Sequence, residues 1–153
     1  MNGADAAAES RPIESDSSLA GTRPLVDRKE HIADGIVHIV LRGGSRGPLP
    51  SWSPGAHIVL PDGTTRQYSL CGDPADAAHY ELAVQRAPES RRGSVYVDDV
   101  LAEGDTIEVS GPRNNFLFVG ADRYVVLAGG IGIRPLVPMI RCAQSIRREW
   151  SLT

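Results

Sequence analysis

The sequence predicts a mainly β protein, with an antiparallel six-stranded barrel over residues 23–120 and the first strand, loop and helix of an α/β domain over residues 121–153. Three observations support this fold class. Short segments of alternating apolar and polar residues recur at roughly 8–12-residue spacing in the first part. Turns rich in Gly, Pro and Asp separate them. Near the end, a continuous apolar run leads into a glycine loop and then into helical periodicity.

The first part begins after a tail, residues 1–22, that is rich in Ala, Ser, Asp and Glu and is therefore expected to be disordered. A short helix is expected to start at Ser94, a plausible N-cap. A turn is expected at residues 111–115, and Trp52 and Phe116 are expected to plug the barrel. The six strands are expected at residues 25–32, 36–41, 56–60, 64–70, 80–86 and 106–110.

The second part reads as the opening of a nucleotide-binding α/β domain. Residues 123–128 form the apolar run of a buried parallel strand, and Pro135 stands at the first position of a helix that continues to about residue 148. One strand and one helix cannot form a doubly wound sheet, so we expect this domain to be incomplete.

Bulk properties exclude several classes of function. A net charge of -3 and a pI near 5.8 argue against nucleic acid as a partner. No apolar run approaches the ~20 residues that span a membrane. The two cysteines and four histidines show no ligand spacing, so no metal site is expected in this chain. The N-terminus lacks the basic start and apolar stretch of a secretion signal, so a cytoplasmic location is expected.

The sequence GTTRQYSLCGDP places a cation, a ring and a hydroxyl within one strand. Alternation puts Arg66 and Tyr68 on one face, and Gln67 and Ser69 on the other. An arginine fork matches a phosphate, a tyrosine ring can lie on a flat heterocycle, and a serine can hydrogen-bond its polar edge. Taken alone, this stretch is also compatible with an ordinary exposed strand.

Two further segments could bind anions. Gly93 and Ser94, at a helix start after Arg91 and Arg92, would offer free backbone N–H groups and the positive end of a dipole. The loop that follows the apolar run, GGIG, contains Gly129, Gly130 and Gly132 but lacks the full dinucleotide fingerprint. Each segment alone is weak evidence for a phosphate-binding site, whereas the order of these segments along the chain is a specific pattern.

The segments RQYSLCGDP, RRGS, GPRNNF and AGGIGIRP, in this order, resemble the ferredoxin-reductase-like flavoprotein superfamily. Within it they look most like the phthalate dioxygenase reductase and vanillate O-demethylase reductase branch. The resemblance implies that Arg66 grips the flavin phosphate, that Tyr68 packs on the flavin ring, and that Ser69, the catalytic candidate, hydrogen-bonds near its reactive N5 edge. Gln67 belongs to the same cofactor strand. The remaining implied cofactor contacts are Arg92 or Arg91, Gly93 and Ser94 at the phosphate, and Gly129, Gly130 and Gly132 at the dinucleotide.

The resemblance also implies an NADH-dependent flavin oxidoreductase, with FMN as the flavin and FAD as the alternative. Electrons would pass from NADH through the flavin to a [2Fe-2S] centre and on to a Rieske-type oxygenase, the expected partner. The [2Fe-2S] domain would follow the nucleotide domain in the full-length family and is not expected in this chain. The alternatives are a truncated flavin-binding module without complete reductase activity, and a barrel that serves only as an interaction module.

The chain departs from the family pattern at Arg134, where the family commonly has a small hydroxyl residue before the proline. This cation could reach a phosphate, crowd the nicotinamide or point to solvent. Structural roles are expected for three other features: Cys71 as a small buried thiol, His57 as a surface or satisfied histidine, and the pair Asp98 and Asp99 as solvated carboxylates.

Overall fold

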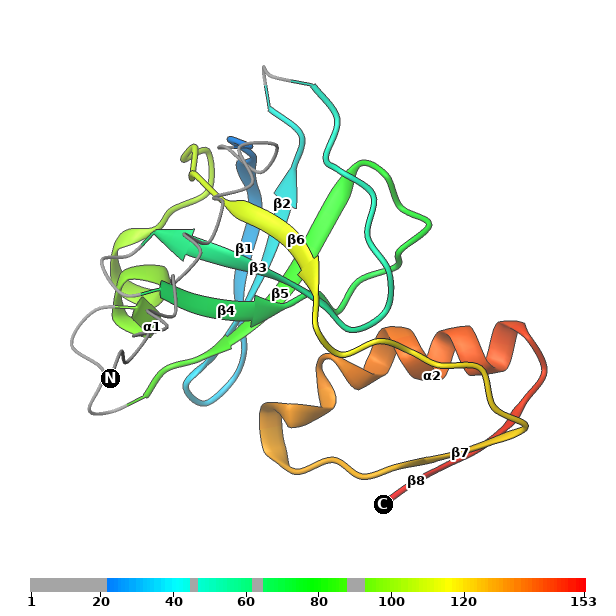
Figure 1. The fold of residues 1–153 in the computed structure, drawn as a ribbon. Coiled ribbons are helices and arrows are strands. Elements are labelled where there is room, and N and C mark those ends of the chain that lie inside the picture. Colours follow the sequence, from blue (N-terminus) through cyan, green and yellow to red (C-terminus); the bar gives the residue numbers. More distant parts are fainter. Residues whose placement is uncertain (1–21, 45–46, 62–64, 88–92) are drawn as a thin grey trace, which may run out of the picture.

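The computed structural model describes residues 22–44, 47–61, 65–87 and 93–153, and Figure 1 shows their arrangement. The predicted tail, apart from Thr22, and Arg91 and Arg92 lie outside the described residues. The strands of the first part are β1 (Leu25–Ala33), β2 (Ile36–Arg42), β3 (Ala56–Pro61), β4 (Thr65–Ser69), β5 (His79–Gln85) and β6 (Ser110–Asn114). The helical elements α1 (Gly93–Val95) and η2 (Tyr96–Val100) follow one another between β5 and β6.

The six strands form two antiparallel three-stranded sheets, in the orders β1-β2-β5 and β4-β3-β6. Isolated bridges connect the sheets at two places. Leu70, which follows β4, bridges Leu82 in the middle of β5, and residues 106 and 109 bridge Leu25 and Thr22, at the first residue of β1 and just before it. The mainly β prediction is confirmed, but the sheets do not close into the continuous six-stranded barrel that the sequence suggested.

The core lies between the two sheets and is built by strict alternation along the strands. In β2 the buried side chains are Val37, Ile39 and Leu41, and in β5 they are Tyr80, Leu82 and Val84. This period of two is the pattern of a strand with one face in the core. Trp52 packs against the core cluster, as predicted for a plug. Phe116 is 53% exposed, so the same prediction was wrong for this ring, which lies on the segment that leaves the sheets.

The last strand of the first part differs from the prediction. The sequence suggested a strand at residues 106–110 and a turn at residues 111–115, whereas β6 is Ser110–Asn114 and pairs with β3. The register shifts between His57 and Val59, opposite Gly111, whose φ of 107° few other residues adopt. Glycine therefore accommodates a β-bulge here. Residues 106–109 make only the isolated bridges, although Ile107 and Val109 are buried.

The helical segment that follows β5 is fixed by an ionic network. Asp98 receives His31 Nε2 at 2.7 Å and Arg86 Nη1 at 3.0 Å, and its side chain is only 10% exposed. The Arg86 guanidinium also contacts Asp99. Asp98 is thus not a solvated carboxylate as the sequence suggested, because His31 of β1 and Arg86 at the end of β5 both hydrogen-bond to it.

The second part is a strand–helix–strand unit beside the two sheets (Figure 1). Its elements are β7 (Arg123–Val126), the 3-10 helix η3 (Gly130–Ile133), α2 (Leu136–Ser145) and β8 (Glu149–Leu152). β7 and β8 are parallel, with Tyr124 opposite Trp150. The strand β8 was not predicted, because four residues after a helix carry little periodic signal. Within the described residues, no helix has the length and apolar character needed to cross a membrane.

Candidate functional site

A groove opens between the two sheets, where β4 and β5 face each other as edge strands. The Leu70–Leu82 bridge joins the residue after β4 to the middle of β5, and beyond it the described residues form no further β-pairing between these strands. The resulting cavity has a volume of about 320 Å³, in the range of small-ligand pockets. Its lining comes from β4, β5, the start of the helical segment and the loop after β7: Arg66, Gln67, Tyr68, Ser69, Ala83, Val84, Gln85, Ser94, Ile131, Gly132, Arg134 and Pro135.

All four candidate residues of β4 line this groove. Tyr68 stands opposite the core residue Ile58, and Arg66 stands opposite Leu60, so these two side chains share a face as predicted. Tyr68 is half-buried and packs against the core, whereas Arg66 is exposed. The strand edge therefore presents a ring fixed by packing beside a cation that is free to reach a ligand.

Ser94 reaches the same groove from the helical segment. It is 2% exposed, and its Oγ accepts a hydrogen bond from the backbone N of Ala87 at 3.1 Å. This bond ties the start of the helical segment to the chain that leaves β5. Gly93 is buried beside it, so both residues of the predicted anion site are firmly placed.

Only part of the glycine loop lines the groove. Gly132 lines it, while Gly129 and Gly130 do not belong to its lining. A Cβ atom built on any of these three glycines would meet no atom within 4 Å, so the surface around the loop is open. The structure therefore joins Gly132 to the β4 residues and leaves the other two glycines on the exposed approach.

The lining is electropositive. It contains two arginines, Arg66 and Arg134, and no Asp or Glu among the described lining residues. At least one anionic group on a ligand would balance this charge. The sequence could not tell whether Arg134 points to solvent. The structure shows that it is half-buried and faces the groove.

Two further polar groups lie close to β4. Cys71 is 5% exposed, and its Sγ donates to the backbone O of Glu81 at 3.4 Å, which confirms the predicted buried thiol. Burial raises the pKa of the Cys71 thiol, and the guanidinium of Arg134 opposes this shift. His57, the cross-strand partner of Ser69, is only 7% exposed, and its Nε2 has no hydrogen-bond partner among the described residues. The reading of His57 as a surface or satisfied histidine was therefore wrong.

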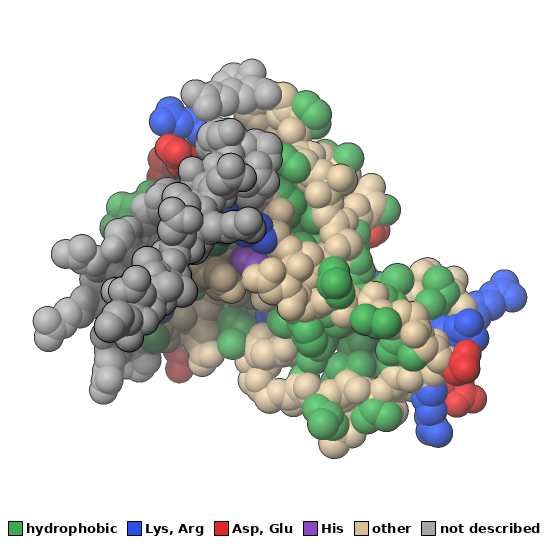
Figure 2. Space-filling view, in the orientation of Figure 1, with side chains coloured by type: hydrophobic (Ala, Val, Ile, Leu, Met, Phe, Trp, Pro, Cys, Tyr) green, Lys and Arg blue, Asp and Glu red, His purple; other side chains and the backbone are tan. Residues whose placement is uncertain are grey.

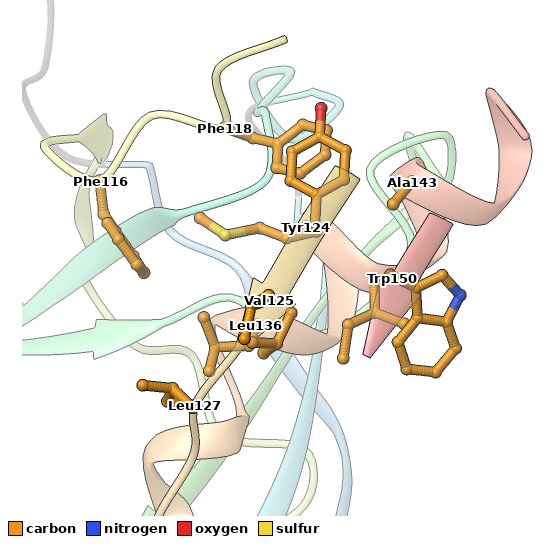
Figure 3. Close-up of a pocket in the computed structure, with 11 residues that line it drawn as sticks. Phe116, Phe118, Tyr124, Val125, Leu127, Leu136, Ala143 and Trp150 are labelled. Carbon is orange, nitrogen blue, oxygen red and sulfur yellow. The ribbon is translucent and has the colours of Figure 1, made fainter. Parts of the chain in front are cut away.

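A second cavity, of about 300 Å³, lies within the strand–helix–strand unit. Figure 2 shows hydrophobic side chains over the centre of this unit and charged ones at its far end, and Figure 3 shows the residues that line the cavity. Phe118 and Tyr124 stack there with ring centroids 4.6 Å apart. Because no charged side chain lines it, this cavity offers packing space rather than a catalytic arrangement. The described residues contain no group of three or more His, Cys, Asp or Glu side chains that could hold a metal ion.

Comparison with known proteins gives a consistent set of relatives, although no family model matches the chain. A phenoxybenzoate dioxygenase subunit beta from Ectopseudomonas oleovorans is 42% identical over 142 residues, which cover 88% of this chain and 44% of that protein. A phthalate dioxygenase reductase from Burkholderia cepacia is 41% identical over 122 residues, which cover 78% of this chain and 38% of that protein. A vanillate O-demethylase oxidoreductase also matches.

The solved structures agree with this result. A phthalate dioxygenase reductase, described as a modular structure for electron transfer from pyridine nucleotides to [2Fe-2S], superposes with a TM-score of 0.82 at 36% identity. The match covers 89% of this chain and 44% of that structure. The chain thus spans less than half the length of the relatives described here.

Proposed function

Since the chain belongs to the family of oxygenase reductase components that includes phthalate dioxygenase reductase, we propose that it is the flavin-binding part of an NADH-dependent flavin oxidoreductase. The whole protein would pass electrons from NADH through FMN toward a [2Fe-2S] centre and a Rieske-type aromatic oxygenase or O-demethylase. The observation that carries the proposal is the groove between β4 and β5, where Arg66, Tyr68 and Ser69 meet Ser94 and Gly132.

The donor set of the groove fits a flavin phosphate. The Arg66 guanidinium is exposed at the groove, and Ser94 lines it from the helical segment. The Ser94 hydroxyl accepts from Ala87 through its oxygen, which leaves its O–H able to donate to a phosphate oxygen. Gly93 adds backbone at the same helix start, and Arg92, outside the described residues, would add charge. A guanidinium fork and a hydroxyl are suitable donors for a phosphate.

The ring end of the flavin fits the other half of β4. Tyr68 offers a half-buried aromatic side chain, and Ser69 offers a hydroxyl one residue further along. Gln67 lines the same strand, and the edges of β4 and β5 provide backbone donors and acceptors for the polar rim of a flat heterocycle. A bound flavin would supply hydride acceptance from NADH and single-electron release, and these residues would bind it, orient it and tune its surroundings.

The approach of NADH is assigned to the glycine loop. Gly129, Gly130 and Gly132 lack side chains on an open surface, so a dinucleotide could come close to the backbone there. Gly132 lies in the groove itself, which would place the nicotinamide beside the proposed flavin ring. We propose FMN rather than FAD because the resemblance to the phthalate dioxygenase reductase branch implies FMN. FAD remains the alternative.

The proposal is tested first by cofactor content. The purified protein should be yellow or should take up FMN, and heat-released flavin should behave as FMN in chromatography. Arg66→Ala should weaken FMN binding about tenfold or more, since the phosphate loses a bidentate partner. Arg42→Ala is the matched control, because Arg42 pairs with Asp27 away from the groove. A protein that binds neither FMN nor FAD would refute the proposal.

A second measurement distinguishes the reductase from its main alternative, a flavin-binding module without complete activity. The chain spans less than half the length of these relatives, and the two possibilities are tested separately. NADH-dependent reduction of an artificial dye by the FMN-loaded protein would support the reductase. Tight FMN binding without dye reduction would support the module. A barrel that serves only as an interaction module would show neither property.

A further inference from the structure

Arg134 occupies a fixed position at one end of the groove. It stands at the end of η3, where its backbone N donates to the backbone O of Ile131 at 3.0 Å. The next residue, Pro135, begins the turn into α2 and also lines the groove. The backbone of Arg134 is therefore held at the end of η3, and its half-buried side chain lines the groove.

The guanidinium is located by its neighbour Cys71. The helix that Arg134 precedes, α2, shares a cavity lining with Asp73, Pro74 and Ala75, which follow Cys71 in the chain. Burial raises the pKa of the Cys71 thiol and, in agreement with this placement, the charge of Arg134 lowers it. Cys71 is itself fixed, because its backbone N and its Sγ both donate to the backbone O of Glu81, at 2.9 Å and 3.4 Å. The positive charge of Arg134 thus lies at the Cys71 end of β4 rather than at the Arg66 end.

The two cations of the groove are therefore separated along the strand. Arg66 and Cys71 are five positions apart, and at roughly 3.3 Å per residue this corresponds to about 16 Å of extended chain. If Arg66 holds the phosphate of the flavin, Arg134 lies toward the end occupied by the ring, beside Ser69. The described lining residues include no carboxylate, and the nearby Glu81 carboxylate, whose charge also acts on Cys71, hydrogen-bonds to His38 Nε2 at 3.2 Å.

We propose that Arg134 holds a positive charge against the flavin ring and thereby favours the reduced flavin over the oxidised one. The proposal rests on the proposed function. Two-electron reduction adds two electrons and one proton to the neutral ring, supplied together as a hydride by NADH, and leaves it with one extra negative charge. A fixed guanidinium in a half-buried groove stabilises that charge without reorganisation. Arg134 is then a determinant of the reduction potential.

The test compares Arg134→Gln with the matched control Arg141→Gln. Arg141 is exposed on α2 and acts on Cys71 through its charge, but it does not line the groove. FMN affinity is measured for each protein in the oxidised form and after anaerobic reduction by dithionite. The potential is measured by equilibration with a reference dye. Circular dichroism melting shows that each variant is folded.

The expected result is that Arg134→Gln leaves oxidised FMN binding nearly unchanged and weakens reduced FMN binding about tenfold. By the thermodynamic cycle, this loss of affinity lowers the reduction potential of bound FMN by about 30 mV, since a tenfold change in a two-electron equilibrium constant corresponds to about 30 mV. Arg134→Lys should retain most of the effect, and Arg141→Gln should show none.

Other outcomes would overturn the proposal in distinguishable ways. An unchanged potential in Arg134→Gln, together with a higher NADH concentration for half-maximal reduction, would assign Arg134 to a phosphate of the nucleotide. An equal loss of affinity for oxidised and reduced FMN would assign it to the flavin phosphate. If the wild-type protein binds no flavin, the proposed function itself fails and this inference fails with it.

Discussion

The glycine loop at the start of η3 allows a prediction in which two substitutions only two positions apart have opposite effects. Gly130 has a φ of 55°, in the left-handed region, whereas Gly132 does not lie in that region. A Cβ added at either position meets no atom within 4 Å. Steric contacts are therefore the same for Gly130→Ala and Gly132→Ala, and the backbone conformation alone decides the difference in stability.

The magnitudes follow from the two backbone terms. Alanine restricts the unfolded chain, which stabilises the protein by about 0.7 kcal/mol where the native conformation is allowed. At Gly130 the left-handed conformation costs alanine about 1.5 kcal/mol, which leaves a net loss of about 0.8 kcal/mol. The two variants should thus differ by about 1.5 kcal/mol. For a chain of this size we expect a difference in Tm of about 3–6 °C, with Gly132→Ala the more stable.

The more stable variant, Gly132→Ala, should nevertheless be the less active one. Gly132 lines the groove, so its alanine variant should be reduced more slowly by NADH in anaerobic stopped-flow measurements, with FMN affinity retained. Gly120→Ala is the control, since its Cβ also meets open space and it does not line the groove. A less stable Gly132→Ala would refute the conformational reasoning. A stabilised Gly132→Ala with an unchanged reduction rate would refute the assignment of this glycine to the nucleotide approach.

Three further predictions concern the framework around the groove. Burial and then Arg113 lower the pKa of His57 below its ordinary 6.5, so the unfolded chain binds this proton more tightly. Stability measured by urea unfolding should therefore be full above about pH 6.5 and fall as the pH drops toward the lowered pKa, and His57→Gln should flatten that decline. Asp98→Asn should lower Tm more than Asp99→Asn, because the Asp98 side chain is 10% exposed and that of Asp99 is 46% exposed; equal effects would contradict the role given to the network. Leu82→Ala should cost about 2–5 kcal/mol in urea unfolding, since Leu82 is 1% exposed in the core, and a cost below 1 kcal/mol would contradict its placement there.

The sequence predicted those strands that carry their own alternation of apolar and polar residues. In β2 and β5, each second residue is buried, and the predicted and observed bounds differ by one residue. The strand β6 was missed because the Gly-Pro pair at residues 111 and 112 is typical of a turn. Its pairing depends on the free edge of β3, and a partner strand leaves no signal in the segment itself.

The candidate site was predictable to the same extent. Local motifs placed Arg66, Tyr68 and Ser69 on one strand, and the structure brings Ser94 and Gly132 to them. The contributions of Ala83, Val84 and Gln85 were missed, because a strand edge supplies backbone groups that any residue carries. The effect of Arg134 on the pKa of Cys71 was also missed, since 63 residues separate the two in the chain.

The incomplete closure of the sheets explains why these elements share one groove. Had β4 and β5 paired along their full length, their backbone groups would satisfy each other and the groove would not exist. Among the described residues, one bridge, between Leu70 and Leu82, ties the end of β4 to the middle of β5 and leaves β4 and the last residues of β5 unpaired with each other. An exposed strand edge is a site where another chain can add a strand, so a bound flat ligand would cover a liability of the fold. The feature that departs from a closed barrel is therefore the one on which the proposed flavin site depends.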